Sequence, residues 1–251
     1  MIVDFHTHIY PSWFGNQRPT LLKQDITFRE LLGNRESKMS TAEDLIASMD
    51  ANSVNVSVSM GLGWDDHGLA RESNDYIIES CRKYPDRLVG FASVNPKWGT
   101  IAAQEADRCA RAGMLGMGEF HPDLQGFDLG DESTMGPIAE VAREHRLIVT
   151  THSSEPIGHI YQGKGQTHPA VIWRFAQNFP DITLVCAHWG GGLPFYSLMP
   201  EVSEVLGNIY FDTAASPLLY KDRIFDIIPL LTGPDRILLG SDYPILATKR
   251  V

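Results

Sequence analysis

The sequence predicts a single (β/α)8 TIM barrel over residues 1–251, and three observations support this fold. Short apolar runs alternate with longer segments of helical periodicity, which is typical of a parallel sheet built from βα units. Ionisable residues follow the ends of several runs, and in a barrel the carboxyl ends of all strands meet on one face. No Gly-x-Gly-x-x-Gly follows the first run, which argues against the alternative of a doubly wound dinucleotide-binding sheet.

Eight apolar runs have the short and bounded character of buried strands. They are Ile2–Phe5, Val54–Met60, Arg87–Val94, Met114–Phe120, Leu147–Thr151, Ile182–Ala187, Ile209–Thr213 and Arg236–Gly240. The predicted helices are a segment that begins near Ser40, then Asn74–Tyr84, Ile101–Ala112, Met135–His145, Pro169–Phe179 and Lys221–Leu231. Only nine residues follow Asp242, so we expect a somewhat distorted barrel with its last helix short or missing.

The formal net charge is −10 and no Lys/Arg cluster is present, which argues against nucleic-acid binding. No window approaches the roughly 18 apolar residues of a membrane span. The N-terminus lacks the pattern of a signal peptide, so the cytoplasm is the expected location. Cys81, Cys109 and Cys186 are expected to be buried thiols. The expected partner is a small-molecule substrate, and a homodimer is left open.

Two histidines stand at the end of the first strand, in Asp4-Phe5-His6-Thr7-His8. Side chains two apart on a strand point to the same side, with Cα atoms roughly 7 Å apart, so these imidazoles can converge on one cation. Neutral imidazole suits zinc and other transition metals. The pair alone is weak evidence, because histidine is also an ordinary polar residue at strand ends.

Three further strands end in one ionisable residue followed by a turn. These residues are His152 after the fifth strand, His188 after the sixth and Asp242 after the eighth. In a closed barrel the eighth strand pairs with the first, which places Asp242 beside His6 and His8. A cation held there would lower the pKa of a bound water and polarise a substrate oxygen, while Asp242 or His188 would move protons.

Four motifs in this order resemble those of the amidohydrolase superfamily: Asp4-x-His6-x-His8, Thr151-His152, Ala187-His188 and Ser241-Asp242-Tyr243-Pro244. Over nearly the whole chain the sequence is similar to the amidohydrolase-related branch that includes aminocarboxymuconate-semialdehyde decarboxylase. The resemblance implies a divalent metal, often zinc, with one or two ions per chain. It also implies a ligand set of His6, His8, His152 and Asp242, with His188 facing the substrate or activating water.

Glu119, at the end of the fourth strand, departs from the decarboxylase-like pattern. TatD-like hydrolases resemble this chain in having Gly-Glu at that point, whereas decarboxylase-like members commonly lack a metal-binding carboxylate there. Glu119 therefore favours hydrolysis and a second metal shared with His152 and His188. The alternative is a polar residue of the barrel mouth that is hydrogen-bonded to a neighbour, since a buried carboxylate is costly unless it is paired.

Four tryptophans follow strand ends in different βα segments: Trp13, Trp64, Trp98 and Trp189. Because these segments share one face of a barrel, we expect a mouth lined with planar side chains that suits an aromatic or apolar substrate. The alternative is that some of them pin loops to the barrel rim. His121 is a further candidate for substrate binding, and the glycine-containing loop 153–167 is a candidate lid.

The first functional prediction is a metal-dependent hydrolase that uses metal-activated water on an amide, lactone or ester bond of a small molecule. The alternative is a metal-dependent, non-oxidative decarboxylase of a small unsaturated or aromatic acid, with the same ligands. A second alternative is a non-catalytic barrel that binds metal or ligand, which a closed four-ligand site would support.

Overall fold

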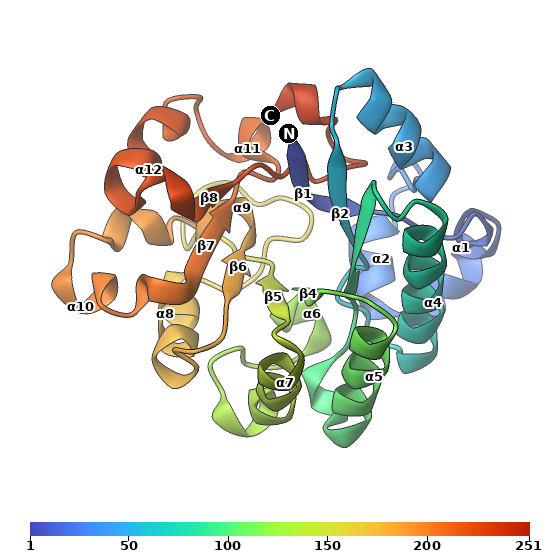
Figure 1. The fold of residues 1–251 in the computed structure, drawn as a ribbon, viewed down its shortest axis with the longest axis horizontal. Coiled ribbons are helices and arrows are strands. Elements are labelled where there is room, and N and C mark those ends of the chain that lie inside the picture. Colours follow the sequence, from blue (N-terminus) through green and yellow to red (C-terminus); the bar gives the residue numbers. More distant parts are fainter.

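The computed structural model describes residues 1–251, and its central feature is one sheet of eight parallel strands in the order β1 to β8, ringed by helices (Figure 1). The strands are β1(Val3–His8), β2(Val56–Met60), β3(Leu88–Ala92), β4(Gly116–Phe120), β5(Ile148–Thr151), β6(Leu184–Cys186), β7(Ile209–Asp212) and β8(Ile237–Leu238). The residues that follow β8 close the barrel against β1, since Phe5 N donates to Leu239 O (2.7 Å) and Asp242 N donates to His6 O (2.9 Å). The predicted (β/α)8 barrel is therefore confirmed.

The observed strands differ from the predicted ones mainly at their ends. β1 continues to His8, because Thr7 pairs with Ser59 and His8 with Met60 of the neighbouring strand. β8 is very short, and the chain beyond it runs close against β1. A Cβ atom at Gly240 would lie 2.8 Å from the Cβ of His6, so this approach requires glycine.

Six helices occupy the predicted segments: α3(Ala42–Ala51), α4(His67–Lys83), α5(Thr100–Arg111), α7(Glu132–His145), α8(Pro169–Asn178) and α12(Ile224–Thr232). A capping box of Thr41 and Asp44 starts α3. α4 begins earlier than predicted, because the Asp66 side chain caps it by accepting a hydrogen bond from Leu69 N (2.8 Å).

Two helices between β1 and α3 were not predicted, namely α1(Trp13–Gln24) and α2(Ile26–Leu32). α1 contains Gly15 and Pro19, which lower intrinsic helix propensity and hide the pattern. Asp25 ends α1 and caps α2, where its side chain accepts a hydrogen bond from Phe28 N (2.7 Å). The segment that follows α2 reaches the cavity described below.

The remaining elements are single turns: η1(Pro96–Trp98), α6(Pro122–Gln125), α9(Ala187–Gly190), η2(Leu193–Tyr196), α10(Pro200–Ser203), η3(Leu206–Asn208), α11(Ser216–Leu219), η4(Pro234–Arg236) and η5(Thr248–Arg250). Only η5 follows β8 within residues 1–251, in agreement with the predicted short or missing last helix. None of the helices is both long enough and apolar enough to cross a lipid bilayer.

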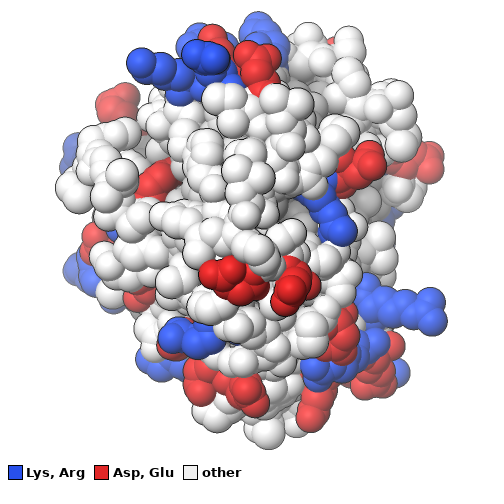
Figure 2. All heavy atoms as spheres, turned by 90° about the vertical axis from the view of Figure 1, so that its left-hand side faces the viewer, with Lys and Arg blue, Asp and Glu red and all other residues white.

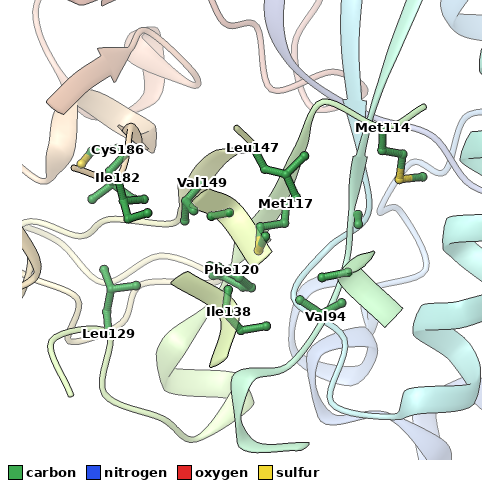
Figure 3. Packing of buried hydrophobic residues seen from close by; sticks show 14 of the residues in the cluster. Val94, Met114, Met117, Phe120, Leu129, Ile138, Leu147, Val149, Ile182 and Cys186 are labelled. Atoms are coloured by element: carbon green, nitrogen blue, oxygen red, sulfur yellow. The ribbon is translucent and has the colours of Figure 1, made fainter. Parts of the chain in front are cut away.

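The main core lies between the strands and the surrounding helices, where Met117 of β4 and Val149 of β5 lie near Ile138 of α7 (Figure 3). Because side chains alternate along a strand, neighbouring positions form a second, smaller cluster inside the barrel. That cluster consists of Phe5, Val58, Met60, Phe91 and Val185. The two clusters hold the strand ends in place on the face where the predicted ligands lie.

The side of the barrel that carries α8, α10 and α12 has a broad area of uncharged side chains across its centre (Figure 2). On this side, lysine and arginine side chains are interspersed with acidic ones and do not merge into one basic surface. The three cysteines are free. Cys109 and Cys186 are buried as predicted, whereas Cys81 is only partly buried.

Candidate metal centre

Two histidine side chains meet at the carboxyl end of β1. His6 and His8 are two residues apart on the strand and point the same way, and both are buried. Their Nε2 atoms lie 3.0 Å apart. The predicted convergence of the two imidazoles is what the structure shows.

The outer nitrogen of each imidazole is fixed by a partner that only accepts hydrogen bonds. His6 Nδ1 lies 2.7 Å from Asp212 Oδ2, and His8 Nδ1 lies 3.2 Å from Met60 O. A carboxylate and a main-chain carbonyl accept and do not donate, so Nδ1 carries the hydrogen in both rings. When the rings are neutral, two Nε2 lone pairs therefore face each other, an arrangement that needs a positive charge between them.

Two carboxylates close around this pair. Glu119 Oε2, from the end of β4, lies 3.6 Å from His6 Nε2 and 3.7 Å from His8 Nε2. Asp242 Oδ1, from the turn after β8, lies 3.8 Å and 3.5 Å from the same two atoms. Asp242 has a backbone φ of 65°, which is uncommon for a residue other than glycine and brings the carboxylate over the barrel.

The second oxygen of Glu119 faces a different pair of histidines. Oε1 lies 3.3 Å from His152 Nδ1 and 3.7 Å from His188 Nε2. The outer nitrogens are again occupied, since His152 Nε2 is 3.2 Å from Ser154 Oγ and His188 Nδ1 is 3.0 Å from Ala214 O. Glu119 thus stands between two groups, one with His6 and His8 and one with His152 and His188.

The charges of the centre support one another. Burial alone lowers the pKa of His6, but the Asp212 and Glu119 carboxylates raise it well above the ordinary value. Burial raises the pKa of Glu119, but His6 and His152 hold it well below the ordinary value. The pKa of Asp242 is also lowered by His8, His6 and His188, against the effect of burial. The centre therefore keeps its carboxylates ionised and favours positive charge near His6.

This donor set fits a divalent cation. Two nitrogens bound to one metal at about 2.1 Å are separated by about 3.0–3.4 Å for octahedral or tetrahedral angles, and the observed Nε2–Nε2 distance agrees. Imidazole and carboxylate ligands suit zinc, manganese and other first-row metals. The residues that could hold it are His6, His8, Glu119 and Asp242 in one group and Glu119, His152 and His188 in the other.

Asp212 was not predicted as a site residue; it lies at the end of β7 and is fully buried. Its Oδ1 accepts hydrogen bonds from His188 N and Ala214 N, both at 3.0 Å, while Oδ2 faces His6. One carboxylate therefore orients two of the four histidines. The available signal was positional, since an aspartate ends an apolar strand here just as Asp242 follows β8.

The centre lies at the base of a cavity of about 370 Å³. His8, Glu119, His152, His188 and Asp242 line its floor. Its upper wall is mainly apolar and includes Leu31, Leu62, Leu218, Leu219 and Ile245. A small molecule can therefore reach the ligand atoms, which argues against a closed structural metal site.

His121 also lines this cavity, and its ring is stacked on His152 with centroids 4.3 Å apart. Its Nε2 is 3.1 Å from Gly163 O, in loop 153–167, while its buried Nδ1 has no hydrogen-bond partner. Burial and the neighbouring His152 lower the pKa of His121 to about 3. His121 is therefore a neutral ring that joins the loop to the floor of the cavity.

Comparison with protein families matches residues 3–250 to the family described as Amidohydrolase. The chain belongs to this family. The amidohydrolase resemblance that the four motifs suggested is thereby confirmed.

Two curated relatives of the chain are decarboxylases. A gamma-resorcylate decarboxylase of Polaromonas sp. is 22% identical over 223 residues, covering 70% of this chain and 65% of the relative. A 2-amino-3-carboxymuconate-6-semialdehyde decarboxylase of Dictyostelium discoideum is 23% identical over 208 residues, covering 70% of this chain and 56% of the relative. The aligned part thus spans less than two thirds of either relative.

Solved structures share the fold of this chain. A 5-carboxyvanillate decarboxylase from Sphingomonas paucimobilis has a TM-score of 0.77 at 16% identity, over 98% of this chain and 89% of the other. A dihydroxybenzoic acid decarboxylase from Polaromonas sp., with bound manganese and the inhibitor 2-nitroresorcinol, has a TM-score of 0.68 at 17% identity, over 100% and 89%.

The prediction of hydrolysis as the main reaction was wrong. It depended on Glu119, but the relatives found by comparison are decarboxylases, which support the alternative instead. The physical reason is that a carboxylate at this point of the barrel helps to hold positive charge, whatever reaction follows. The position of Glu119 between two groups of histidines is retained as a feature of the site.

The predicted mouth of tryptophans also has to be corrected, because none of the four side chains lines the cavity. Trp64 is fully buried against Phe14 and Phe28, and Trp189 is fully buried with its Nε1 donating to Ser216 Oγ (2.6 Å). Trp13 packs against Phe14, and Trp98 lies beside His67. The observed contacts of the four tryptophans are therefore with neighbouring side chains and not with the cavity, which is compatible with the alternative that they pin loops to the barrel rim.

Proposed function

We propose that this amidohydrolase-family protein is a metal-dependent, non-oxidative decarboxylase of a small aromatic or unsaturated carboxylic acid. The observation that carries the proposal is a cluster of four histidines and two carboxylates at the floor of an apolar-walled cavity. Such a cavity suits an acid with a planar apolar body whose carboxylate turns toward the floor. The activities of the relatives support this reaction class.

We assign the cation to His6, His8 and Asp242, with Glu119 beside them. Manganese and zinc both accept these ligands, and elemental analysis distinguishes them. When bound, a divalent cation polarises the substrate oxygens and withdraws electron density from the bond that breaks. Residues 1–251 form the single domain that carries this activity in the proposal.

The side chains of the cavity have distinct tasks. The apolar wall of Leu31, Leu62 and Leu218 holds the body of the acid and excludes water from the reacting carbon. His188 Nδ1 donates to Ala214 O, so its Nε2, which faces the cavity floor, is the atom that can take up and release a proton. Asp212, which accepts from His188 N, positions that residue.

The overall step is balanced by one proton. The bond between the substrate carbon and its carboxylate breaks and carbon dioxide leaves, while the same carbon gains a hydrogen. His188 Nε2 delivers that proton in this proposal and is reprotonated from solvent after the product leaves.

The test is release of ¹³C-carbon dioxide from carboxyl-labelled hydroxybenzoic acids by protein reconstituted with manganese or zinc, with the product formed in D2O examined by NMR. Release together with one deuterium at the former carboxyl-bearing carbon supports the proposal. The matched control is His8→Ala, which removes a metal ligand. Turnover of esters, lactones or amides without carbon dioxide release from any acid would contradict it.

A further inference from the structure

Ser154 connects the loop that follows β5 to the metal centre. Its hydroxyl oxygen lies 3.2 Å from His152 Nε2 and accepts a hydrogen bond from Gly165 N (2.9 Å). Its main-chain N donates to Thr167 O (3.0 Å). The residue is fully buried, so these hydrogen bonds are shielded from water. Ser154 therefore joins the two ends of loop 153–167 and contacts one of the four histidines of the centre.

The neighbours of His152 determine which of its ring nitrogens carries the hydrogen. His152 Nδ1 lies 3.3 Å from Glu119 Oε1. A carboxylate accepts and does not donate, so the hydrogen of the neutral ring is on Nδ1 and Nε2 is an acceptor. Because Ser154 Oγ already accepts from Gly165 N, its own hydrogen is free to point at His152 Nε2.

The other three histidines of the centre are held differently. The outer nitrogens of His6, His8 and His188 face a carboxylate or a main-chain carbonyl, and these groups can only accept. A hydroxyl can donate or accept, so its orientation depends on its remaining hydrogen bonds. For Ser154 the remaining partner belongs to the loop. His152 is thus the one histidine of the four whose outer partner is itself oriented by loop 153–167.

The arm of the loop that returns to α8 is held close to Ser154. Asp123 Oδ2, in α6, accepts hydrogen bonds from Gln166 N (2.8 Å) and Thr167 Oγ1 (3.2 Å). A Cβ atom at Gly165 would overlap the Asp123 carboxylate, so this close approach requires glycine. The donor that orients the Ser154 hydroxyl is therefore fixed only while this arm is in place.

The tip of the same loop forms part of the cavity wall. The lining residues that it contributes are His159, Tyr161, Gln162 and Gly163. A ligand in the cavity therefore meets the tip of the loop and the metal centre at the same time. The base of the loop, at Ser154, is the point where the two are joined by hydrogen bonds.

We propose that Ser154 is a positioning residue through which the loop over the cavity controls His152. While the loop is seated, Ser154 donates to His152 Nε2, which keeps the ring hydrogen on Nδ1 and the ring aligned with Glu119. When the loop lifts, Gly165 N no longer orients the hydroxyl, and both nitrogens of His152 compete for the ring hydrogen. The inference rests on the proposed function only in taking the loop to cover the reacting acid.

The test is the tautomer of His152 in chelator-treated protein labelled with ¹⁵N-histidine. Long-range ¹H–¹⁵N NMR distinguishes a ring nitrogen that bears hydrogen from one that does not, and the signals lost in His152→Gln identify the ring. The native protein is expected to carry the hydrogen on Nδ1. Ser154→Ala should shift the ratio of tautomers about three- to tenfold toward Nε2, as for the loss of one hydrogen bond. Gly165→Ala, which unseats the loop, should shift it in the same direction.

The neighbouring residue provides a matched control. Ser153 is also fully buried, but its Oγ has no hydrogen-bond partner, so Ser153→Ala should leave the tautomer ratio at the native value. Hydrogen on His152 Nε2 in the native protein would overturn the inference, and so would a native ratio in Ser154→Ala. A shift in Ser154→Ala without one in Gly165→Ala would refute the control by the loop.

A second measurement separates this inference from the proposed function. In 2-nitrophenol, a planar nitro group beside a hydroxyl stands in for the leaving carboxylate. Calorimetric titration of manganese-loaded protein is expected to give about three- to tenfold weaker binding to Ser154→Ala, because the ligand then has to order the loop and His152 separately. Binding to Ser153→Ala should be unchanged. Equal binding to both variants would overturn the inference, whereas failure of the native protein to bind would refute the proposed function and leave the tautomer result intact.

Discussion

His6 Nδ1 and Asp212 Oδ2 lie 2.7 Å apart in the interior of the barrel, and neither side chain is exposed. The two residues come from β1 and β7, so their hydrogen bond joins strands that lie on either side of the short β8. It fixes the tautomer of His6 and leaves Nε2 free to face His8. Asp212 also accepts from His188 N, so a single carboxylate couples the two sides of the centre.

We therefore expect Asp212→Asn to lower the affinity of the site at His6, His8 and Asp242 for a divalent cation about 10- to 100-fold. This is typical when the hydrogen-bond partner of a ligand histidine is lost. Competition with a fluorescent chelator measures this change. The protein offers a matched control in Asp107→Asn, because Asp107 Oδ1 lies 2.7 Å from His145 Nε2 in a pair remote from the barrel mouth. An unchanged affinity in Asp212→Asn would show that His6 is oriented by other contacts.

The raised pKa of His6 predicts how the metal-free protein responds to alkali. Since the folded-state value lies above 6.5, the protonated ring contributes stability that is fully present below that pH and is lost as pH rises through the higher folded-state pKa. Urea unfolding of chelator-treated protein between about pH 6 and about pH 10 should show this loss. Asp212→Asn should make the free energy of unfolding depend less on pH in this range. A pH profile identical to that of the native protein would show that the Asp212 carboxylate does not raise the pKa of His6.

Glu119 predicts the opposite response on the acid side. Its folded-state pKa lies well below 4.5, so its contribution to stability is present above that value and is lost as pH falls through the lower folded-state pKa. Glu119→Gln should therefore weaken the decline of the free energy of unfolding in acid. The measurement is urea unfolding of metal-free protein below about pH 5. A decline as steep as in the native protein would contradict the prediction.

Because the two oxygens of Glu119 face different pairs of histidines, we expect the protein to bind two cations of unequal affinity. Glu119→Gln should abolish the weaker site and leave the tighter one, at His6, His8 and Asp242. Titration followed by elemental mass spectrometry gives the ratio of metal to protein. One ion per chain in both the native protein and Glu119→Gln would show that Glu119 does not bind two cations at once. The proposed decarboxylation uses the tighter site alone, so either count is compatible with it.

His188 provides the test of proton delivery. His188→Asn should lower kcat about 10²- to 10⁴-fold, the usual range for loss of a general acid, while the first cation stays bound. The rate of carbon dioxide release and the metal content of the same sample are measured together. His188 also belongs to the group of Glu119, His152 and His188, so its replacement could act by removing a second cation. The loss of kcat therefore has to be seen also when only the site at His6, His8 and Asp242 is filled. If the rate of carbon dioxide release fell only in proportion to the metal content, His188 would not be the residue that delivers the proton.

The sequence was sufficient for the barrel architecture and for the strand ends at which the candidate ligands lie. Periodicity placed every strand, and the order of strand ends around a barrel brought His6, His8, His152, His188 and Asp242 together. What it could not give was which side of a strand end points into the barrel. Trp64 and Trp189 follow strands as the ligands do, but they are fully buried away from the cavity.

The residues that shape the cavity were hidden for a related reason. Arg18 of α1 donates to Asn34 O and Ser37 O of the segment that follows α2, and Gly15 and Pro19 obscure the helical periodicity of α1. These contacts depend on how the chain turns between α1 and α3, which local pattern does not specify. Asp212 was missed because its function is to orient other residues, and a lone aspartate after a strand has no distinguishing spacing.

Trp64 tests the corrected role of the tryptophans. Its ring centroid lies 6.0 Å from those of Phe14 and Phe28, and the side chain is fully buried beneath α1 and α2. Trp64→Ala should therefore destabilise the protein by about 3–5 kcal/mol through the cavity that it leaves. Trp98→Ala, at a partly exposed position, should cost much less. Urea unfolding measures the loss.

Below the unfolding transition, binding of 2-nitrophenol by metal-loaded Trp64→Ala should remain within about twofold of the native value, because the removed ring does not line the cavity. A large loss of binding without loss of stability would instead place Trp64 at the substrate.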